Sequence, residues 1–170
     1  MNKLALAVAI PVAIATSMGA SVAVAQDKVS ATLASSAGNN VAGTVTFVQE
    51  GGKVIVIAEV TGLKPGPHGF HVHEKGDCSA PDFTSAGGHF NPTGKPHGDP
   101  AHADHHVGDM PMLVADASGK ATLRSDVSAM TIGGANGITG RSVVVHADPD
   151  DFKSQPAGNS GPRVACGVIK

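Results

Sequence analysis

The sequence of 170 residues has few of the side chains that nucleic-acid-binding proteins use most. It has no Trp and no Tyr, and its five Phe offer few aromatic rings on which bases could stack. Basic charge is not in excess either, because 12 Lys and Arg stand against 14 Asp and Glu, for a formal net charge of -2. A protein that neutralises phosphates needs a basic stripe. We therefore expect no nucleic-acid partner.

Long apolar runs are confined to the N-terminus. Residues 4–15 are apolar apart from Pro11, and Ala23-Val24-Ala25 has the A-x-A pattern of a signal cleavage site. A membrane-spanning helix needs roughly 20 apolar residues, which this run does not supply. We expect residues 1–25 to be a cleaved export signal, residues 26–170 to form one domain, and no membrane span to remain after cleavage.

Cysteine is scarce, with Cys78 and Cys166 as the only two. In an oxidising compartment an isolated pair most simply forms one disulfide, which here would tether a loop to the C-terminal strand. The alternative is that both thiolates bind a metal. It is disfavoured because the histidines already supply more ligands than one site needs.

Helical periodicity is nearly absent, and strand signals recur along the chain. Candidate strands span residues 29–35, 41–47, 53–60, 69–73, 112–116, 121–127, 142–146 and 163–169. This pattern predicts an all-β domain, an eight-stranded antiparallel Greek-key barrel or immunoglobulin-like sandwich. Two Pro- and Gly-rich stretches, 74–110 and 147–162, lie outside it. Loops of that length in a compact domain are usually functional.

Histidine is abundant: there are nine, and all but one lie between His68 and His106. His71 and His73 are two positions apart on a candidate strand, so their side chains share one face. Alone, such a pair is better explained by the exposed polar face of a strand. More candidates follow: His89, His97, His106 and Asp109 in the long loop, and His146 at a strand end. Together they suffice for two metal ions, because imidazole suits copper and zinc, and a set with a carboxylate suits structural zinc.

Five motifs make the chain recognisable. They are His68-Gly-Phe-His-Val-His-Glu74, Ser85-Ala-Gly-Gly-His-Phe-Asn-Pro92, His106-Val-Gly-Asp109, Gly140-Arg-Ser-Val-Val-Val-His146 and Gly161-Pro-Arg-Val-Ala-Cys-Gly-Val-Ile169. With them the sequence resembles the exported bacterial copper/zinc superoxide dismutases, from about Val41 to Ile169. The resemblance implies one copper ion, held by His71, His73, His89 and His146, and one zinc ion, held by His89, His97, His106 and Asp109. His89 would then bridge the two ions.

The resemblance also implies roles for residues that composition alone would leave on the surface. Asp150 matches a carboxylate that hydrogen-bonds one copper ligand and one zinc ligand and so fixes their rings. Arg163 matches an arginine that attracts and orients the superoxide anion beside copper. His89 would supply the proton. Lys153 is open to two interpretations, a steering charge and a solvated lysine.

The remaining histidines receive no metal role. His68 resembles a structural residue bonded to the backbone, and His102 and His105 are expected to be loop residues. His106 is preferred to its neighbour His105, because the family pattern places Asp109 three positions after the ligand.

The function implied is the disproportionation of superoxide to dioxygen and hydrogen peroxide in the periplasm, which would protect the cell envelope. The alternatives are a metal scavenger or copper-delivery protein without turnover, and a structural sandwich that uses zinc for stability. The presence of His89, His146 and Arg163 favours the enzyme. Since the chain ends at Lys170, where the animal cytosolic enzymes continue, both a monomer and a bacterial-type homodimer remain open.

Overall fold

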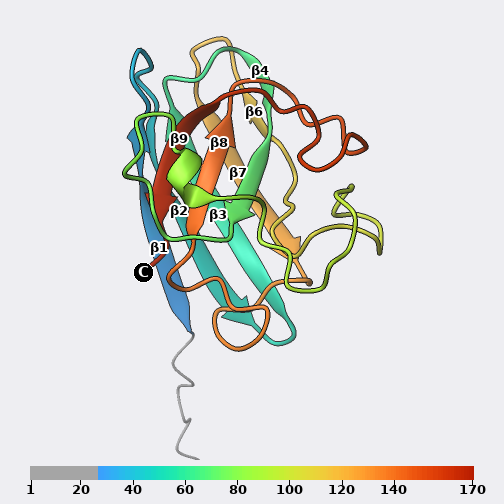
Figure 1. Ribbon diagram of the computed structural model, residues 1–170. Helices are drawn as coiled ribbons and strands as arrows, with labels where there is room; N and C mark the ends of the chain where they lie inside the picture. Colours follow the sequence, from blue (N-terminus) through green and yellow to red (C-terminus); the bar gives the residue numbers. More distant parts are fainter. Residues whose placement is uncertain (1–26) are drawn as a thin grey trace, which may run out of the picture.

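The computed structural model describes residues 27–170, which fold almost entirely into strands and loops (Figure 1). The elements are β1 (Lys28–Ser35), β2 (Ala42–Glu50), β3 (Lys53–Thr61), β4 (Gly66–His68), β5 (Phe70–His73), the 3-10 turn η1 (Thr84–Ala86), β6 (Leu113–Ala115), β7 (Ala121–Val127), β8 (Ser142–His146) and β9 (Arg163–Val168). The expected export signal lies outside the described residues. Within them, no helix is long and apolar enough to cross a membrane.

The strands form one antiparallel sheet in the order β4-β6-β7-β3-β2-β1-β9-β8-β5. β4 and β5 stand at the two ends of this order, yet only Gly69 separates them in the chain. The sheet therefore curls round until its ends meet, as the barrel of strands in Figure 1 shows. The predicted all-β antiparallel barrel is confirmed.

The described residues contain nine strands, where the sequence predicts eight. The additional strand is β4, which pairs with β6 from Gly66 opposite Ala115 to His68 opposite Leu113. Pro67 lies at its centre, and a proline cannot donate to a strand ladder, so this segment carries no strand signal. The strand predicted at 69–73 is thus the second of two short pieces.

The barrel core follows the alternation of apolar residues. Val45 and Phe47 of β2 and Val54 and Val56 of β3 are buried, and each fully buried side chain of this size contributes roughly 1.5–3 kcal/mol. β8 differs, because all five of its residues are buried. Its outward-facing Val144 is covered by a second, smaller cluster with Phe83, Ala86 and Cys166.

Two long loops cover the outer face of β5 and β8. One joins β5 to β6 and the other joins β8 to β9; their yellow-green and dark-red parts lie on the same side of the barrel in Figure 1. The first loop is fastened to β9 by a disulfide between Cys78 and Cys166, which are 88 residues apart. The predicted disulfide is confirmed, and both cysteines are therefore unavailable as metal ligands.

Candidate metal centre

Buried ligand-type side chains gather between the barrel wall and the two loops. In β5, Phe70 and Val72 point into the core, so His71 and His73 lie on the outer face, where the loops bury them. Two groups have their ligand atoms within 4.8 Å of one another: His71, His73, His89 and His146, and His89, His97, His106 and Asp109. The structure thus brings together every ligand that the resemblance implies, with His89 in both groups.

Hydrogen bonds fix the rings of the first group. His73 Nδ1 donates to Gly87 O at 3.0 Å, and His146 Nδ1 donates to Gly161 O at 3.1 Å. His71 Nε2 donates to Asp150 Oδ2 at 2.6 Å. Because a carbonyl or carboxylate oxygen only accepts, these nitrogens carry the hydrogens. In the neutral ring, the other nitrogen then carries a free lone pair.

These lone pairs are the unusual feature of the group. No hydrogen-bond partner among residues 27–170 reaches His71 Nδ1, His73 Nε2, His89 Nε2 or His146 Nε2, and all four atoms are buried. Buried polar atoms nearly always have a partner. One convergent lone pair from each of four imidazoles forms a donor set that suits copper.

The second group has the spacing of a tetrahedral site. Asp109 Oδ1 lies 2.9 Å from His89 Nδ1, 3.1 Å from His97 Nδ1 and 3.4 Å from His106 Nδ1. Zinc bonds of ~2.0–2.1 Å at tetrahedral angles put ligand atoms roughly 3.3 Å apart. Asp109 Oδ2 accepts from the backbone N–H of Gly98 at 3.2 Å and of His106 at 2.9 Å, which keeps Oδ1 turned to the rings. The donor set therefore fits zinc.

Burial keeps the first group neutral. It lowers the pKa of His71 to about 3 and that of His146 to about 4, and it lowers the pKa of His73 and of His89 as well. All four imidazoles are therefore uncharged at neutral pH, which is the form that binds metal.

Asp150 links the two groups. Its Oδ2 accepts from His71 Nε2 at 2.6 Å, and its Oδ1 accepts from His97 Nε2 at 2.9 Å. Burial opposes ionisation, but these bonds hold the pKa of Asp150 below its usual range. Burial likewise opposes the charged form of His97, yet hydrogen bonds to Asp109 and Asp150 raise its pKa to about 9.

A cavity of about 320 Å³ opens onto the first group. Its lining includes His73, His89, His146 and Arg163, together with Asn91, Pro156 and Ala157 of the loops. The Arg163 guanidinium is fixed at its edge, because Nη2 donates to Gly87 O at 2.6 Å and Nη1 donates to Phe83 O. A positive charge therefore stands beside the four lone pairs.

The other histidines stay outside both groups. Both ring nitrogens of His68 lie 2.8 Å from backbone oxygens, those of His146 and Lys64, as expected of a structural residue. His102 has an 80% exposed side chain, and His105 Nδ1 donates to His106 O at 2.6 Å. Of the two neighbours, His106 and not His105 lies in the second group, as the preference for His106 predicts.

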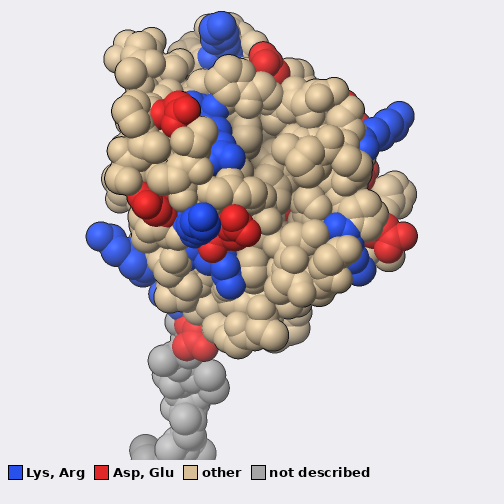
Figure 2. All heavy atoms as spheres, viewed as in Figure 1, with Lys and Arg blue, Asp and Glu red and all other residues tan. Residues whose placement is uncertain are grey.

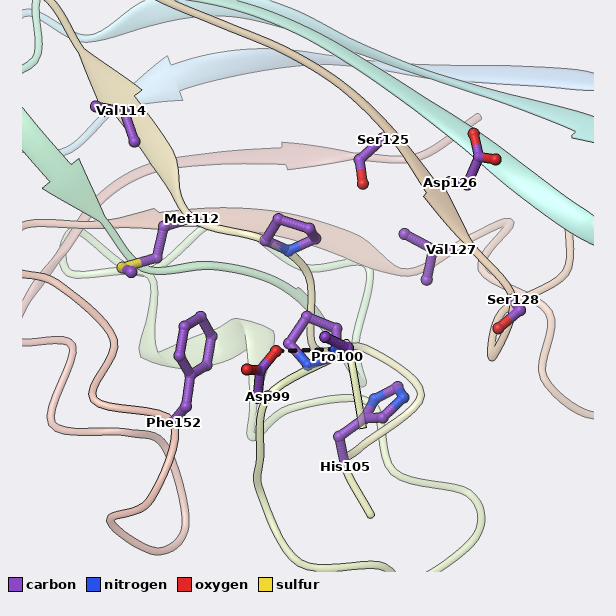
Figure 3. Close-up of a pocket in the computed structure, with 12 residues that line it drawn as sticks. Asp99, Pro100, His105, Met112, Val114, Ser125, Asp126, Val127, Ser128 and Phe152 are labelled. Carbon is purple, nitrogen blue, oxygen red and sulfur yellow. Dashed lines mark hydrogen bonds between the residues drawn. The ribbon is translucent and has the colours of Figure 1, made fainter. Parts of the chain in front are cut away.

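A larger cavity of about 490 Å³ is lined by two residues that hydrogen-bond to Asp150. Met112 and Phe152 line it with Asp99 and His105, as Figure 3 shows. Met112 Sδ accepts from Asp150 N at 3.3 Å, and Phe152 N donates to Asp150 Oδ1 at 2.7 Å. None of the ligand-type residues of the two groups lines this cavity. Its connection to the site is through Met112 and Phe152, which hold Asp150 by these hydrogen bonds.

The face of the molecule in Figure 2 carries charges of both signs, with Lys and Arg interspersed among Asp and Glu. Lys153 is exposed and is not part of the lining of the 320 Å³ cavity. Of Lys153 and Arg163, Arg163 alone lines the cavity.

Sequence reasoning missed one residue of this region. The side-chain amide of Gln155 makes two hydrogen bonds to the backbone of His97. Gln155 belongs to none of the five motifs, and a polar residue in a Pro- and Gly-rich loop gives no signal that it contacts a segment 58 residues away.

Comparisons with known proteins agree with this geometry. The family model described as copper/zinc superoxide dismutase (SODC) matches residues 41–169. The chain belongs to the copper/zinc superoxide dismutase family. It is 48% identical over 136 residues to "Superoxide dismutase [Cu-Zn] 2" of Brassica juncea, covering 76% of this chain and 89% of that protein. It is 43% identical over 141 residues to "Superoxide dismutase [Cu-Zn]" of Deinococcus radiodurans, covering 76% and 78%.

The fold of the dismutase also matches a solved structure. The crystal structure of the clock protein EA4 superposes with a TM-score of 0.78 at 41% identity, covering 85% of this chain and 94% of that chain. The protein is thus a copper/zinc superoxide dismutase, which converts superoxide to dioxygen and hydrogen peroxide and uses one copper and one zinc ion as cofactors.

Proposed function

We propose that His71, His73, His89 and His146 hold the copper ion and that His89, His97, His106 and Asp109 hold the zinc ion. The observation that carries this assignment is the set of four buried lone pairs with no partner in residues 27–170. His89 would contribute to both sites, because it belongs to both groups, its Nε2 is buried without a partner in residues 27–170, and its Nδ1 lies 2.9 Å from Asp109 Oδ1.

The residues around the two sites have different roles in the reaction. Copper, when bound, supplies the one-electron redox cycle, which zinc cannot supply. At Nε2, His89 would hold either copper or a proton, and it would give the proton to the peroxide that forms from superoxide, while its Nδ1 stays beside Asp109 Oδ1. Asp150 fixes the rings of His71 and His97. Arg163 attracts the superoxide anion and orients it in the cavity.

We also propose that the protein is the exported bacterial form of the family, with residues 1–25 as signal and residues 26–170 as the mature enzyme. Periplasmic superoxide would be its substrate, and protection of the cell envelope its role. The disulfide supports this proposal, because such bonds persist in oxidising compartments. Mass spectrometry of periplasmic protein should find Gln26 as the first residue. The mature protein should sediment as a monomer or a bacterial-type homodimer.

Metal substitution tests the bridge. The oxidised protein should contain one copper and one zinc per chain, and cobalt placed at the zinc site should show exchange coupling to copper. Coupling requires the shared imidazole of His89. Two bound metals without coupling would show that the bridge is wrongly assigned.

Turnover separates the enzyme from a metal carrier that uses the same ligands. The metal-loaded protein should consume superoxide at a catalytic rate. Full copper and zinc occupancy without superoxide consumption would support the carrier.

A further inference from the structure

His97 lies in a part of the chain where no strand fixes the backbone. It belongs to the loop between β5 and β6, and the residue is only 3% exposed. Its ring is held through Nε2 by Asp150. The backbone N–H and C=O of His97 also need partners, because buried backbone groups left unpaired cost free energy.

Both partners come from one side chain in the other loop. Gln155 Oε1 accepts from His97 N at 2.9 Å, and Gln155 Nε2 donates to His97 O at 2.9 Å. The side-chain amide thus pairs with the backbone as a neighbouring strand residue would. Although Gln155 is itself exposed, the group that it holds is buried.

The same amide is anchored in its own loop, and that loop leads directly to the cavity. Gln155 Nε2 also donates to Lys153 O at 3.2 Å, and the next residues, Pro156 and Ala157, line the cavity. Gly158 then passes so close that a Cβ there would lie 2.6 Å from His97 Nε2. The cavity wall and the zinc-side histidine are therefore connected at Gln155.

We propose that Gln155 is a positioning residue for the zinc site. Its amide fixes the backbone of His97, so that the ring presents Nδ1 to the other zinc ligands while Nε2 stays on Asp150. This inference depends on the proposed assignment of His97 as a zinc ligand. Partners that orient a ligand typically change metal affinity by about 10- to 100-fold when they are removed.

Replacement by methionine tests the hydrogen bonds without removing the bulk of the side chain. In the copper-loaded protein, Gln155→Met should weaken zinc binding about 10- to 100-fold, as measured by competition with a chromogenic chelator. Gln155→Glu keeps the acceptor and loses the donor, so its zinc affinity should fall between those of the wild type and Gln155→Met.

Gln49 provides a matched control. Its amide makes three backbone hydrogen bonds, to Gly51 O at 3.1 Å, Lys53 O at 3.0 Å and Ile132 N at 3.1 Å, at another part of the barrel. Gln49→Met should leave zinc affinity unchanged. In cobalt-substituted protein, Gln155→Met should shift the visible absorption bands of the metal, and Gln49→Met should not.

The results distinguish the positioning role of Gln155 from the assignment of His97 as a zinc ligand. Wild-type zinc affinity and an unshifted cobalt spectrum in Gln155→Met would overturn the positioning role, and so would an equal loss of zinc in Gln49→Met. If His97→Ala retained zinc with wild-type affinity, the ligand assignment itself would be wrong. Weakened zinc binding in both His97→Ala and Gln155→Met, with none in Gln49→Met, supports the proposal.

Discussion

At the scale of single residues, the acceptor beside each imidazole decides which nitrogen is available to a metal. Gly87 O accepts a hydrogen bond from Nδ1 of His73, and Gly161 O accepts one from Nδ1 of His146, so the lone pair of each ring is at Nε2. Asp150 accepts a hydrogen bond from Nε2 of His71, so the lone pair of that ring is at Nδ1. Gly87 O also accepts from Arg163. A single carbonyl therefore orients both a proposed copper ligand and the cation beside it.

Arg163 should control how fast superoxide reaches the site. Arg163→Ala should lower the second-order rate constant with superoxide roughly ten-fold or more, at unchanged metal content, because local steering is lost. The wild-type rate should fall with ionic strength, since screening limits the reach of a charge to about 10 Å at 0.1 M salt. Stopped-flow assays at several salt concentrations measure both effects.

Two variants separate charge from hydrogen bonding at this position. Arg163→Lys should have an intermediate rate, because the charge remains while the planar fork that bonds Phe83 O and Gly87 O is lost. Arg124 is exposed on β7, and Arg124→Ala should leave the rate nearly unchanged. An Arg163→Ala enzyme with the wild-type rate and salt response would contradict a role in steering.

At the scale of elements, the loop after β5 depends on β9. The disulfide joins Cys78 to Cys166, and Phe83 and Ala86 pack on Val144 beside it. Arg163 begins β9, three residues before Cys166, and bonds back to the same loop. The disulfide and the guanidinium thus fasten one segment to one strand at two points.

Loss of the disulfide should therefore affect both stability and activity. Cys78→Ser should lower the free energy of unfolding by a few kcal/mol, since chain-entropy models give ~4–5 kcal/mol for closing a loop this long. Activity should fall as well, because the carbonyls that hold Arg163 lose their anchor. Denaturant melts and superoxide assays measure the two effects. Free thiols in fully active wild-type protein, or an unchanged midpoint in Cys78→Ser, would contradict this account.

The sequence predicts most strands and the groups of ligand-type residues, but not every strand or contact. Alternation of apolar residues locates β2, β3 and β7, because each packs one face on the core. β4 could not be predicted, since its pairing depends on a sheet that closes at Gly69. The grouping of the histidines could be predicted from the motifs. The contact between Gln155 and His97 could not be predicted, because it depends on how two irregular loops meet.

At the scale of the whole molecule, the barrel and the loops enclose imidazole nitrogens that have no hydrogen-bond partner among residues 27–170. The metal-free protein retains buried lone pairs without partners in residues 27–170, whereas ions that bind only the folded state add to its stability. Protons compete for the same nitrogens. The stability of the metal-free protein should therefore depend on pH in a way set by these histidines.

In metal-free protein, the free energy of unfolding should fall as the pH drops below about 6.5, the ordinary pKa of histidine. Burial lowers the pKa of His71 to about 3 and that of His146 to about 4, so between these values and 6.5 only the unfolded chain takes up the protons. Each such histidine contributes a slope of up to about 1.4 kcal/mol per pH unit.

His97 gives the free energy of unfolding the opposite dependence on pH. Its pKa is raised to about 9, so its contribution is full below 6.5 and is lost as the pH rises through 9. Urea midpoints from pH 4 to 10 should therefore decline on both sides for metal-free protein. His97→Ala should remove the alkaline decline and leave the acid one. Metal-loaded protein should resist acid further, because bound ions exclude the protons. A metal-free midpoint that stays constant from pH 7 to pH 4 would contradict the burial of neutral imidazoles in this fold.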